Sequence, residues 1–141
     1  APPALSAELR KVHQYVNFCG VTPLQCALAD FMAEHPEHID ELPGFYQAKR
    51  DLFKAGLSKT QFKLLPTPGT YFQCVDYTNL NIPEAKLSEA EFCKWLTSQV
   101  GVAAIPVSAF YDQPTESGVI RFCFAKQEQT LANALQRLQT L

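Results

Sequence analysis

The sequence predicts an α+β fold in which a small, mainly antiparallel sheet is covered by helices on one side. Helical periodicity alternates with short β-branched or aromatic runs in the order ααα-ββ-α-ββ-α, and this order favours such a layered arrangement. The strand-like runs occur in pairs joined by turn-rich segments, which is typical of antiparallel pairing. Hydrophobic residues make up 47% of the 141 residues, with ten Phe and five Tyr, so a single domain over residues 1–141 can bury a real core.

Composition argues against several classes of function. The net charge is −2 and no basic cluster occurs, so we expect no nucleic-acid partner. No apolar run approaches the length of a membrane span, and no signal-peptide pattern opens the chain. The five cysteines form no C-x-x-C pair and indicate reduced thiols in a cytoplasmic protein. His35 and His38 lack a third ligand at suitable spacing, so we expect surface histidines and no metal site.

Two helices are predicted in the first 35 residues. Ser6 is expected to cap the first, which ends near Tyr15. Thr22-Pro23-Leu24-Gln25 is a typical helix start, with Thr22 as the cap and proline in the first turn. This second helix ends at His35-Pro36. Its apolar stripe is expected to lie in the core and consists of Leu24, Ala27, Leu28, Phe31 and Met32.

A third helix is expected from Glu37 to Ala55, with Gly56 as its end. Pro43 would either kink this helix or split off its first turn. Two strands, Gln61–Leu65 and Tyr71–Tyr77, then form a candidate hairpin.

The sequence Ser88-Glu89-Ala90-Glu91 is a capping box, and the helix that it begins should run to Val100 and stop at Gly101. Two more strands are predicted at Val102–Val107 and Val119–Ala125, joined by a loop with Pro114 and Gly118. An amphipathic helix closes the chain; its apolar stripe is Leu131, Leu135 and Leu138.

One charged residue, Arg121, interrupts the last predicted strand. Alternation puts Arg121 on a face of small side chains, opposite the bulky face formed by Ile120, Phe122 and Phe124, which we expect to be core. A guanidinium in an apolar strand needs an anion, because burying an unpaired charge is costly. Two interpretations are open: an ion pair with an acidic residue of this chain, or a site for a ligand carboxylate, which the planar fork binds through two hydrogen bonds.

The stretch GVAAIPVSAFY (101–111) followed by VIRFCFAK (119–126) resembles the end of class I aminotransferases of fold type I, which depend on pyridoxal phosphate. The likeness is greatest to the methionine and kynurenine aminotransferase group. Two further segments match in the same order, VHQYVNFCGVTPLQ (12–25) and PTPGTYFQCVD (66–76).

The resemblance implies roles for two residues. Arg121 would bind the α-carboxylate of the amino-acid substrate, and Phe18 would reach across a homodimer to the neighbouring substrate pocket. For Phe18 the alternative is a core aromatic residue at a helix–helix corner. Ser108–Tyr111 would line the entry to the site, unless they form an ordinary polar surface loop.

The resemblance also implies that the chain is the C-terminal domain of a longer enzyme, with residues 1–35 as helices that link to a missing large domain. That parent would transfer an amino group from methionine or an aromatic or large apolar amino acid to a 2-oxo acid. Ser58-Lys59-Thr60 looks superficially like the family's cofactor lysine site, but residues 61–65 do not continue as the family does. We therefore expect no catalytic residue here, no pyridoxal phosphate bound to this chain alone, and self-association of the isolated chain. The second interpretation is a stand-alone amino-acid-binding module without chemistry.

Overall fold

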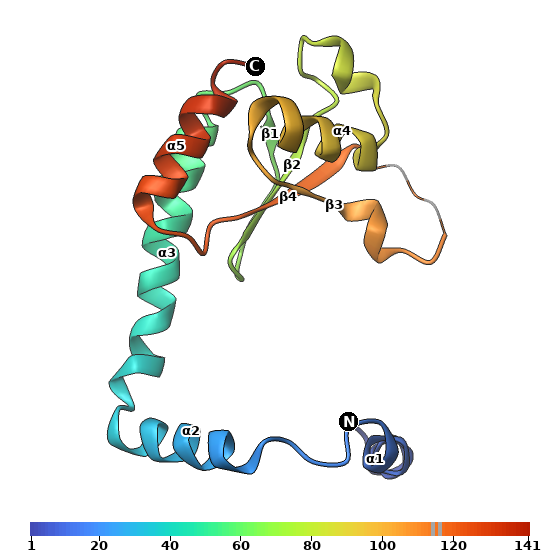
Figure 1. Ribbon diagram of the computed structural model, residues 1–141, viewed down its shortest axis with the longest axis vertical. Coiled ribbons are helices and arrows are strands. Elements are labelled where there is room, and N and C mark those ends of the chain that lie inside the picture. Colours follow the sequence, from blue (N-terminus) through green and yellow to red (C-terminus); the bar gives the residue numbers. More distant parts are fainter. Residues whose placement is uncertain (114, 116) are drawn as a thin grey trace. The chain divides into compact units, whose positions relative to one another are not determined.

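The computed structural model describes residues 1–113, 115 and 117–141. The predicted loop position of Pro114 lies outside the described residues, as does Glu116. The chain divides into two compact units, Ala1–Leu42 and Pro43–Leu141. The described residues form five α-helices and a four-stranded antiparallel sheet (Figure 1). The predicted α+β class and the predicted order of elements are therefore confirmed.

The first unit contains helices α1 (Pro3–Val16) and α2 (Thr22–Glu34). Both begin earlier than predicted: Ser6 lies inside α1, and Thr22 is the first residue of α2, with Val21 at the cap position. In each helix a proline sits in the first turn, where its fixed φ suits the helix and its missing N–H costs nothing. Proline therefore sets these starts, and neither helix has a side-chain cap.

The apolar stripe of α2 is not buried, so the prediction that it forms core is wrong for this chain. Leu24 is 68% exposed, Leu28 57% and Phe31 41%. No residue from 1 to 42 is buried. The stripe has the periodicity of a packed helix, but two short helices cannot cover such a surface by themselves.

Helix α3 spans Glu37–Leu57 and runs two residues further than predicted. Pro43 lies inside it, and the division between the two units falls at this residue. The sequence suggested that Gly56 ends this helix, but α3 continues through Gly56 to Leu57. A Cβ atom there would overlap the side chain of Leu135, so the glycine allows α3 and α5 (Glu128–Leu138) to approach closely.

The sheet has the strand order β1-β2-β4-β3, with every pair antiparallel. The predicted hairpin is confirmed as β1 (Lys63–Leu64) and β2 (Phe72–Asp76). Strand β3 (Ile105–Pro106) is shorter than predicted, because proline cannot donate to the ladder and Val107–Phe110 turn into a 3-10 helix (η3). The longest pairing joins β2 to β4 (Val119–Cys123), which lies between β2 and β3.

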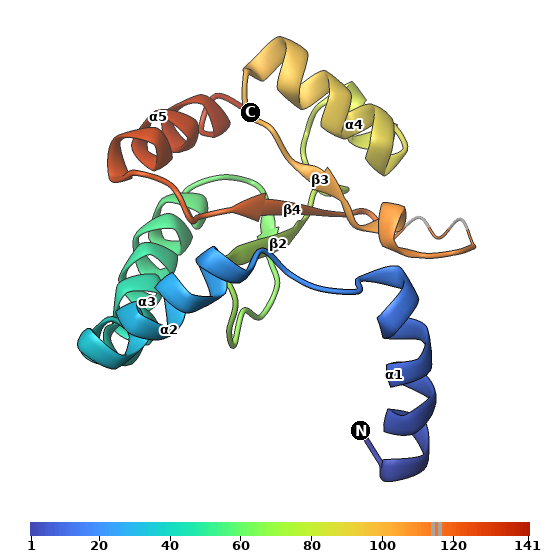
Figure 2. The same cartoon turned by 60° about the horizontal axis from the view of Figure 1, so that its bottom comes forward.

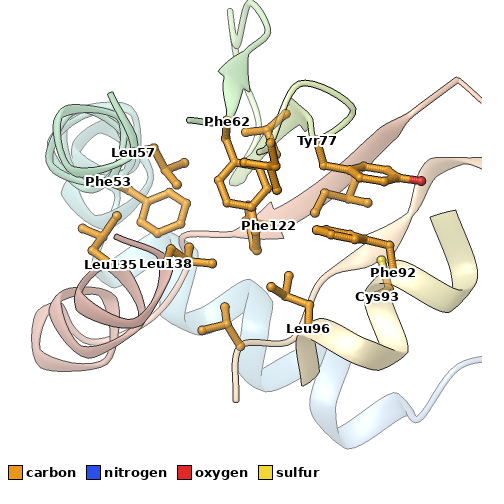
Figure 3. Packing of buried hydrophobic residues seen from close by; sticks show 14 of the residues in the cluster. Phe53, Leu57, Phe62, Tyr77, Phe92, Cys93, Leu96, Phe122, Leu135 and Leu138 are labelled. Atoms are coloured by element: carbon orange, nitrogen blue, oxygen red, sulfur yellow. The ribbon is translucent and has the colours of Figure 1, made fainter. Parts of the chain in front are cut away.

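One face of the sheet carries the core. Ile120, Phe122 and Phe124 are at most 2% exposed, as the alternation predicted. Helices α4 (Glu89–Trp95) and α5 lie on the same side of the strands (Figure 2). In the core on this side of the sheet, the ring of Phe122 packs edge-on against the rings of Phe53 and Phe62 (Figure 3). Leu135 and Leu138 of α5 belong to the same cluster.

Local signals in the sequence set both ends of α4. Ser88 and Glu91 form the predicted capping box, with the Glu91 N–H donating to Ser88 Oγ at 3.4 Å. The helix continues as a π-helical turn, Leu96–Val100, and ends at Gly101, whose φ of 76° is left-handed.

Among the described residues, no helix has both the length and the hydropathy needed to cross a membrane.

Candidate functional site

Strand β4 places Arg121 on the face of the sheet opposite the core. Its neighbours across the ladder are Cys74 on β2 and Ile105 on β3. Residues 119, 121 and 123 of this strand are all half-buried, whereas Ile120 and Phe122 between them are buried. The alternation therefore brings a guanidinium to the middle of a partly covered surface.

Two aromatic rings enclose the guanidinium of Arg121. Its central carbon lies 3.9 Å from the ring centre of Phe72 and 4.7 Å from that of Phe110. The Nε atom is buried and has no hydrogen-bond partner within residues 1–113, 115 and 117–141. Over the same residues no carboxylate lies within ion-pair distance of Arg121, so the structural ion pair considered from the sequence is not found there.

A hollow of about 490 Å³ opens in front of Arg121. It is lined by Pro66, Thr67, Pro68, Gly69, Thr70, Phe72, Cys74 and Arg121. Thr70 adopts a φ of 66°, which is unusual for a β-branched residue. The lining contains one cation and no carboxylate, so the hollow favours an anion of small size.

A buried amide holds one wall of this hollow. Gln73 is 1% exposed, and its Nε2 donates to the carbonyl oxygens of Leu65 and Cys74, both at 2.8 Å. Its Oε1 accepts from Thr67 Oγ1 at 2.9 Å. Every polar atom of this side chain is satisfied, which fixes the turn that leads into residues 66–70.

A buried carboxylate holds the segments that carry Phe110 and Arg121. Glu89, the first residue of α4, is fully buried and accepts from the backbone N–H of Ser108 and of Ser117, each at 2.7 Å. It also accepts from Ser117 Oγ at 2.8 Å and from the N–H of Val119 at 3.3 Å. Burial acts to raise the pKa of Glu89, but the hydrogen bonds from Ser108 and Ser117 outweigh it and hold the pKa below its ordinary value.

The parts played by Phe72, Phe110 and Glu89 were not foreseen from the sequence. From the sequence, Phe72 is one residue of the predicted strand Tyr71–Tyr77, and Glu89 is one residue of the predicted capping-box segment. Phe110 was placed in a loop that would either line the site or face solvent; it lies over Arg121. Strand alternation could have indicated the contact of Phe72 with Arg121. Phe72 lies on β2 two residues before Cys74, on the same face of the sheet, and Cys74 is the residue paired with Arg121.

Phe18 belongs to the other unit and does not share a compact body with Arg121. It follows α1 with a φ of 59° and is 83% exposed, so the alternative of a core aromatic residue is wrong for this chain. Left-handed backbone is uncommon outside glycine, which marks this turn as a specified conformation. Its proposed role at a substrate pocket stays a prediction.

The residues around Arg121 do not form a complete site for pyridoxal phosphate. Such a site needs a lysine for the Schiff base and a carboxylate for the pyridinium nitrogen. Neither residue type lines the hollow. Lys59 lies in the turn after α3, where Ser58 Oγ donates to the carbonyl of Ala55. What the hollow offers is the cation that can orient a carboxylate.

Comparison with known proteins identifies the family of this chain. The family model described as aminotransferase class I and II matches residues 1–138. The methionine aminotransferase of Escherichia coli is 48% identical over the whole chain, and its crystal structure superposes with a TM-score of 0.85. A Mycobacterium tuberculosis protein described as a probable N-succinyldiaminopimelate aminotransferase is 35% identical over 99% of the chain, and a structure of N-succinyldiaminopimelate aminotransferase from that organism gives a TM-score of 0.83. Kynurenine–oxoglutarate transaminase 3 of Rattus norvegicus is 32% identical over 99% of the chain.

The chain spans 36%, 36% and 34% of the length of these three relatives, respectively. The resemblance stated from the four sequence segments is confirmed: the chain belongs to the class I and II aminotransferase family.

Proposed function

We propose that this chain is the C-terminal, substrate-carboxylate-binding domain of a pyridoxal-phosphate-dependent aminotransferase. The parent would move an amino group from methionine or an aromatic or large apolar amino acid to a 2-oxo acid. The observation that carries the proposal is the guanidinium of Arg121, enclosed by two rings and facing a hollow without a carboxylate. A cation held in this way is available to an anion from outside the domain.

Arg121 would act by position rather than by proton transfer. A guanidinium can donate two parallel hydrogen bonds to the α-carboxylate, which fixes the orientation of the amino acid. Orientation of this kind lowers the barrier because the entropy of alignment is lost on binding rather than in the reaction step. The cofactor, when bound in the parent, would withdraw electrons from the substrate Cα, and its lysine and its carboxylate partner would come from outside this chain.

Several features of the parent belong to the same proposal. It would be a cytoplasmic homodimer, and Phe18 would reach the neighbouring substrate pocket. The relatives named for methionine and kynurenine support a large, apolar amino acid as donor. The chain on its own would not transaminate, and activity of the purified 141-residue chain with pyridoxal phosphate would contradict this.

Kinetics on a chimera test the role of Arg121. In the chimera, this chain replaces the matching 36% of the E. coli methionine aminotransferase, with which it aligns over its full length. Removing one partner of a desolvated charge pair costs about 2–5 kcal/mol, so Arg121→Ala should lower kcat/KM for methionine by about 30- to 4,000-fold. Arg121→Lys should also lose activity, because lysine lacks the planar fork.

The matched control is Arg137→Lys, at an exposed arginine of α5 that bonds the carbonyls of Val100 and Gly101. It should keep kcat/KM within a few-fold of the unmodified chimera. Equal kcat/KM values for Arg121→Lys and Arg137→Lys would overturn the assignment.

The same hollow supports a second candidate, a binding module that recognises a free amino acid without chemistry. The observation in its favour is that all residues lining the hollow come from the unit Pro43–Leu141. Calorimetry of the 141-residue chain with methionine and with its 2-oxo acid separates the two functions. Affinity that Arg121→Ala abolishes would favour the module, whereas no measurable binding would favour the domain of a larger enzyme.

A further inference from the structure

We propose that Glu89 is a positioning residue, whose carboxylate holds Phe110 against the guanidinium of Arg121. The inference deepens the proposed function by naming a residue that would prepare the carboxylate site. Its structural part does not depend on which substrate the parent uses. Its kinetic part rests on the proposed role of Arg121.

The two carboxylate oxygens of Glu89 bind different segments of the chain. Oε2 accepts from the N–H of Ser108, which lies in η3 two residues before Phe110. Oε1 accepts from Ser117 and Val119, and Val119 lies two residues before Arg121 on β4. One side chain therefore fixes both the segment that carries the ring and the strand that carries the cation.

Loss of the Glu89 carboxylate would leave the groups that donate to it without their acceptor. Among the residues that the structure describes, the backbone N–H groups of Ser108, Ser117 and Val119 and the hydroxyl of Ser117 donate to it. A glutamine in place of Glu89 would present an NH₂ group to some of these donors, and two donors cannot bond each other. Since a buried N–H group needs an acceptor, η3 would shift so that the N–H of Ser108 can bond to solvent.

The other ring over Arg121 does not depend on Glu89. Phe72 lies on β2, which is held to β4 by a five-residue ladder. A disturbance that begins at Glu89 should therefore separate Phe110 from Arg121 and leave Phe72 in place. This difference distinguishes a positioning role from a general loss of structure.

Nuclear Overhauser effects in the 141-residue chain provide the test. We expect Glu89→Gln to abolish or greatly weaken the contacts between the Phe110 ring and the Arg121 side chain, while the contacts of Phe72 with Arg121 persist. Glu89→Asp should restore the Phe110 contacts in part. The control is Glu91→Gln, an exposed position of the same helix where glutamine still satisfies a capping box. Unchanged Phe110 contacts in a folded Glu89→Gln chain would overturn the proposal.

Hydrogen exchange on the unmodified chain keeps the test informative if Glu89→Gln does not fold. The amides of Ser108 and Ser117 lie outside the strands but donate to a buried carboxylate, so they should exchange at least about tenfold more slowly than the exposed Thr115. Equal exchange at the three amides would count against the proposal.

The chimera described above gives the kinetic readout. Glu89→Gln should raise KM for methionine about tenfold with a smaller change in kcat, and Glu89→Asp should recover part of the loss. If Arg121→Lys has no kinetic effect but the Phe110 contacts depend on Glu89, the proposed function fails and the positioning role stands. If Arg121→Lys is inactive and Glu89→Gln is normal in both readouts, only the positioning role fails.

Discussion

Replacing Gly56 by alanine is expected to destabilise the unit Pro43–Leu141, although alanine is the better helix former. A Cβ atom at this position would overlap the end of the Leu135 side chain, which is 8% exposed and packed in the core. The other glycine of the same helix, Gly44, has no atom within 4 Å of the equivalent position. Helix α3 thus contains the substitution and its control.

The two contributions at Gly56 have opposite signs. Exchanging glycine for alanine inside a helix stabilises it by about 1 kcal/mol. Forcing a methyl group into a packed core costs about 1–3 kcal/mol. The expected net change for Gly56→Ala is therefore a loss of about 0–2 kcal/mol, whereas Gly44→Ala should gain about 0.5–1 kcal/mol.

Urea unfolding followed by tryptophan fluorescence measures this difference. The chain has one tryptophan, Trp95, which packs against Phe92 with ring centres 5.5 Å apart, so the signal reports on the unit that contains Gly56. Gly56→Ala should be less stable than Gly44→Ala by about 0.5–3 kcal/mol. Equal gains at both positions would refute the close approach of α3 and α5.

A double-mutant cycle with Leu135→Ala tests the cause. Alone, Leu135→Ala should cost about 2–5 kcal/mol because it leaves a cavity. In the Gly56→Ala background the new methyl group occupies part of that space, so the cost should be smaller by about 1 kcal/mol or more. Additive effects would place the strain somewhere other than this contact.

Three further predictions concern titration, thiol reactivity and association. The lowered pKa of Glu89 means that its stabilising effect is complete above the ordinary glutamate pKa of about 4.3 and is lost as the pH falls through the folded-state pKa; Glu89→Gln should flatten the loss of urea stability below about pH 5, and an unchanged slope would assign that loss to other groups. Burial, followed by the Glu89 charge, raises the pKa of Cys93 to about 11, so an aromatic disulfide reagent at about pH 8 should label the exposed Cys19 and Cys26 quickly and Cys93 slowly; equal rates would contradict the burial of Cys93. The exposed stripe on α2 should make the isolated chain self-associate, and Leu28→Glu should weaken association in light scattering across a concentration series; a strict monomer at every concentration would contradict the expectation.

The elements that were predicted well from the sequence depend on neighbours in the chain. The capping box at Ser88 and the left-handed end at Gly101 require only a few consecutive residues, and both are in place. The core face of β4 follows from alternation, so Ile120 and Phe122 are buried as expected. Burial of Leu24 failed because periodicity shows which face of a helix is apolar but not what covers it.

Arg121 could be singled out from the sequence as a candidate site residue, but the residues that surround it could not. A lone charge in an apolar strand stands out in a sequence, whereas the residues that enclose it come from other segments. Glu89 is the clearest example of a residue whose role could not be predicted from the sequence. An acidic residue in the first turn of a helix is common, because its charge interacts favourably with the helix dipole. Its actual partners lie 19 to 30 residues further along the chain, and only the folded sheet brings them to its carboxylate.

The environment of Arg121 shows how a half-buried cation is stabilised without a carboxylate partner among residues 1–113, 115 and 117–141. An acidic side chain at this position would satisfy the guanidinium permanently and would compete with any incoming carboxylate. Aromatic faces instead attract the cation by about 0.5–2 kcal/mol and do not act as the carboxylate acceptor that its N–H groups favour. The rings of Phe72 and Phe110 offset part of the cost of burial without supplying a carboxylate, which suits the proposed role of Arg121 as an anion-binding group. The carboxylate of Glu89 accepts from the backbone N–H groups of Ser108 and Ser117, and these bonds are the basis of its proposed role in holding the segment of Phe110.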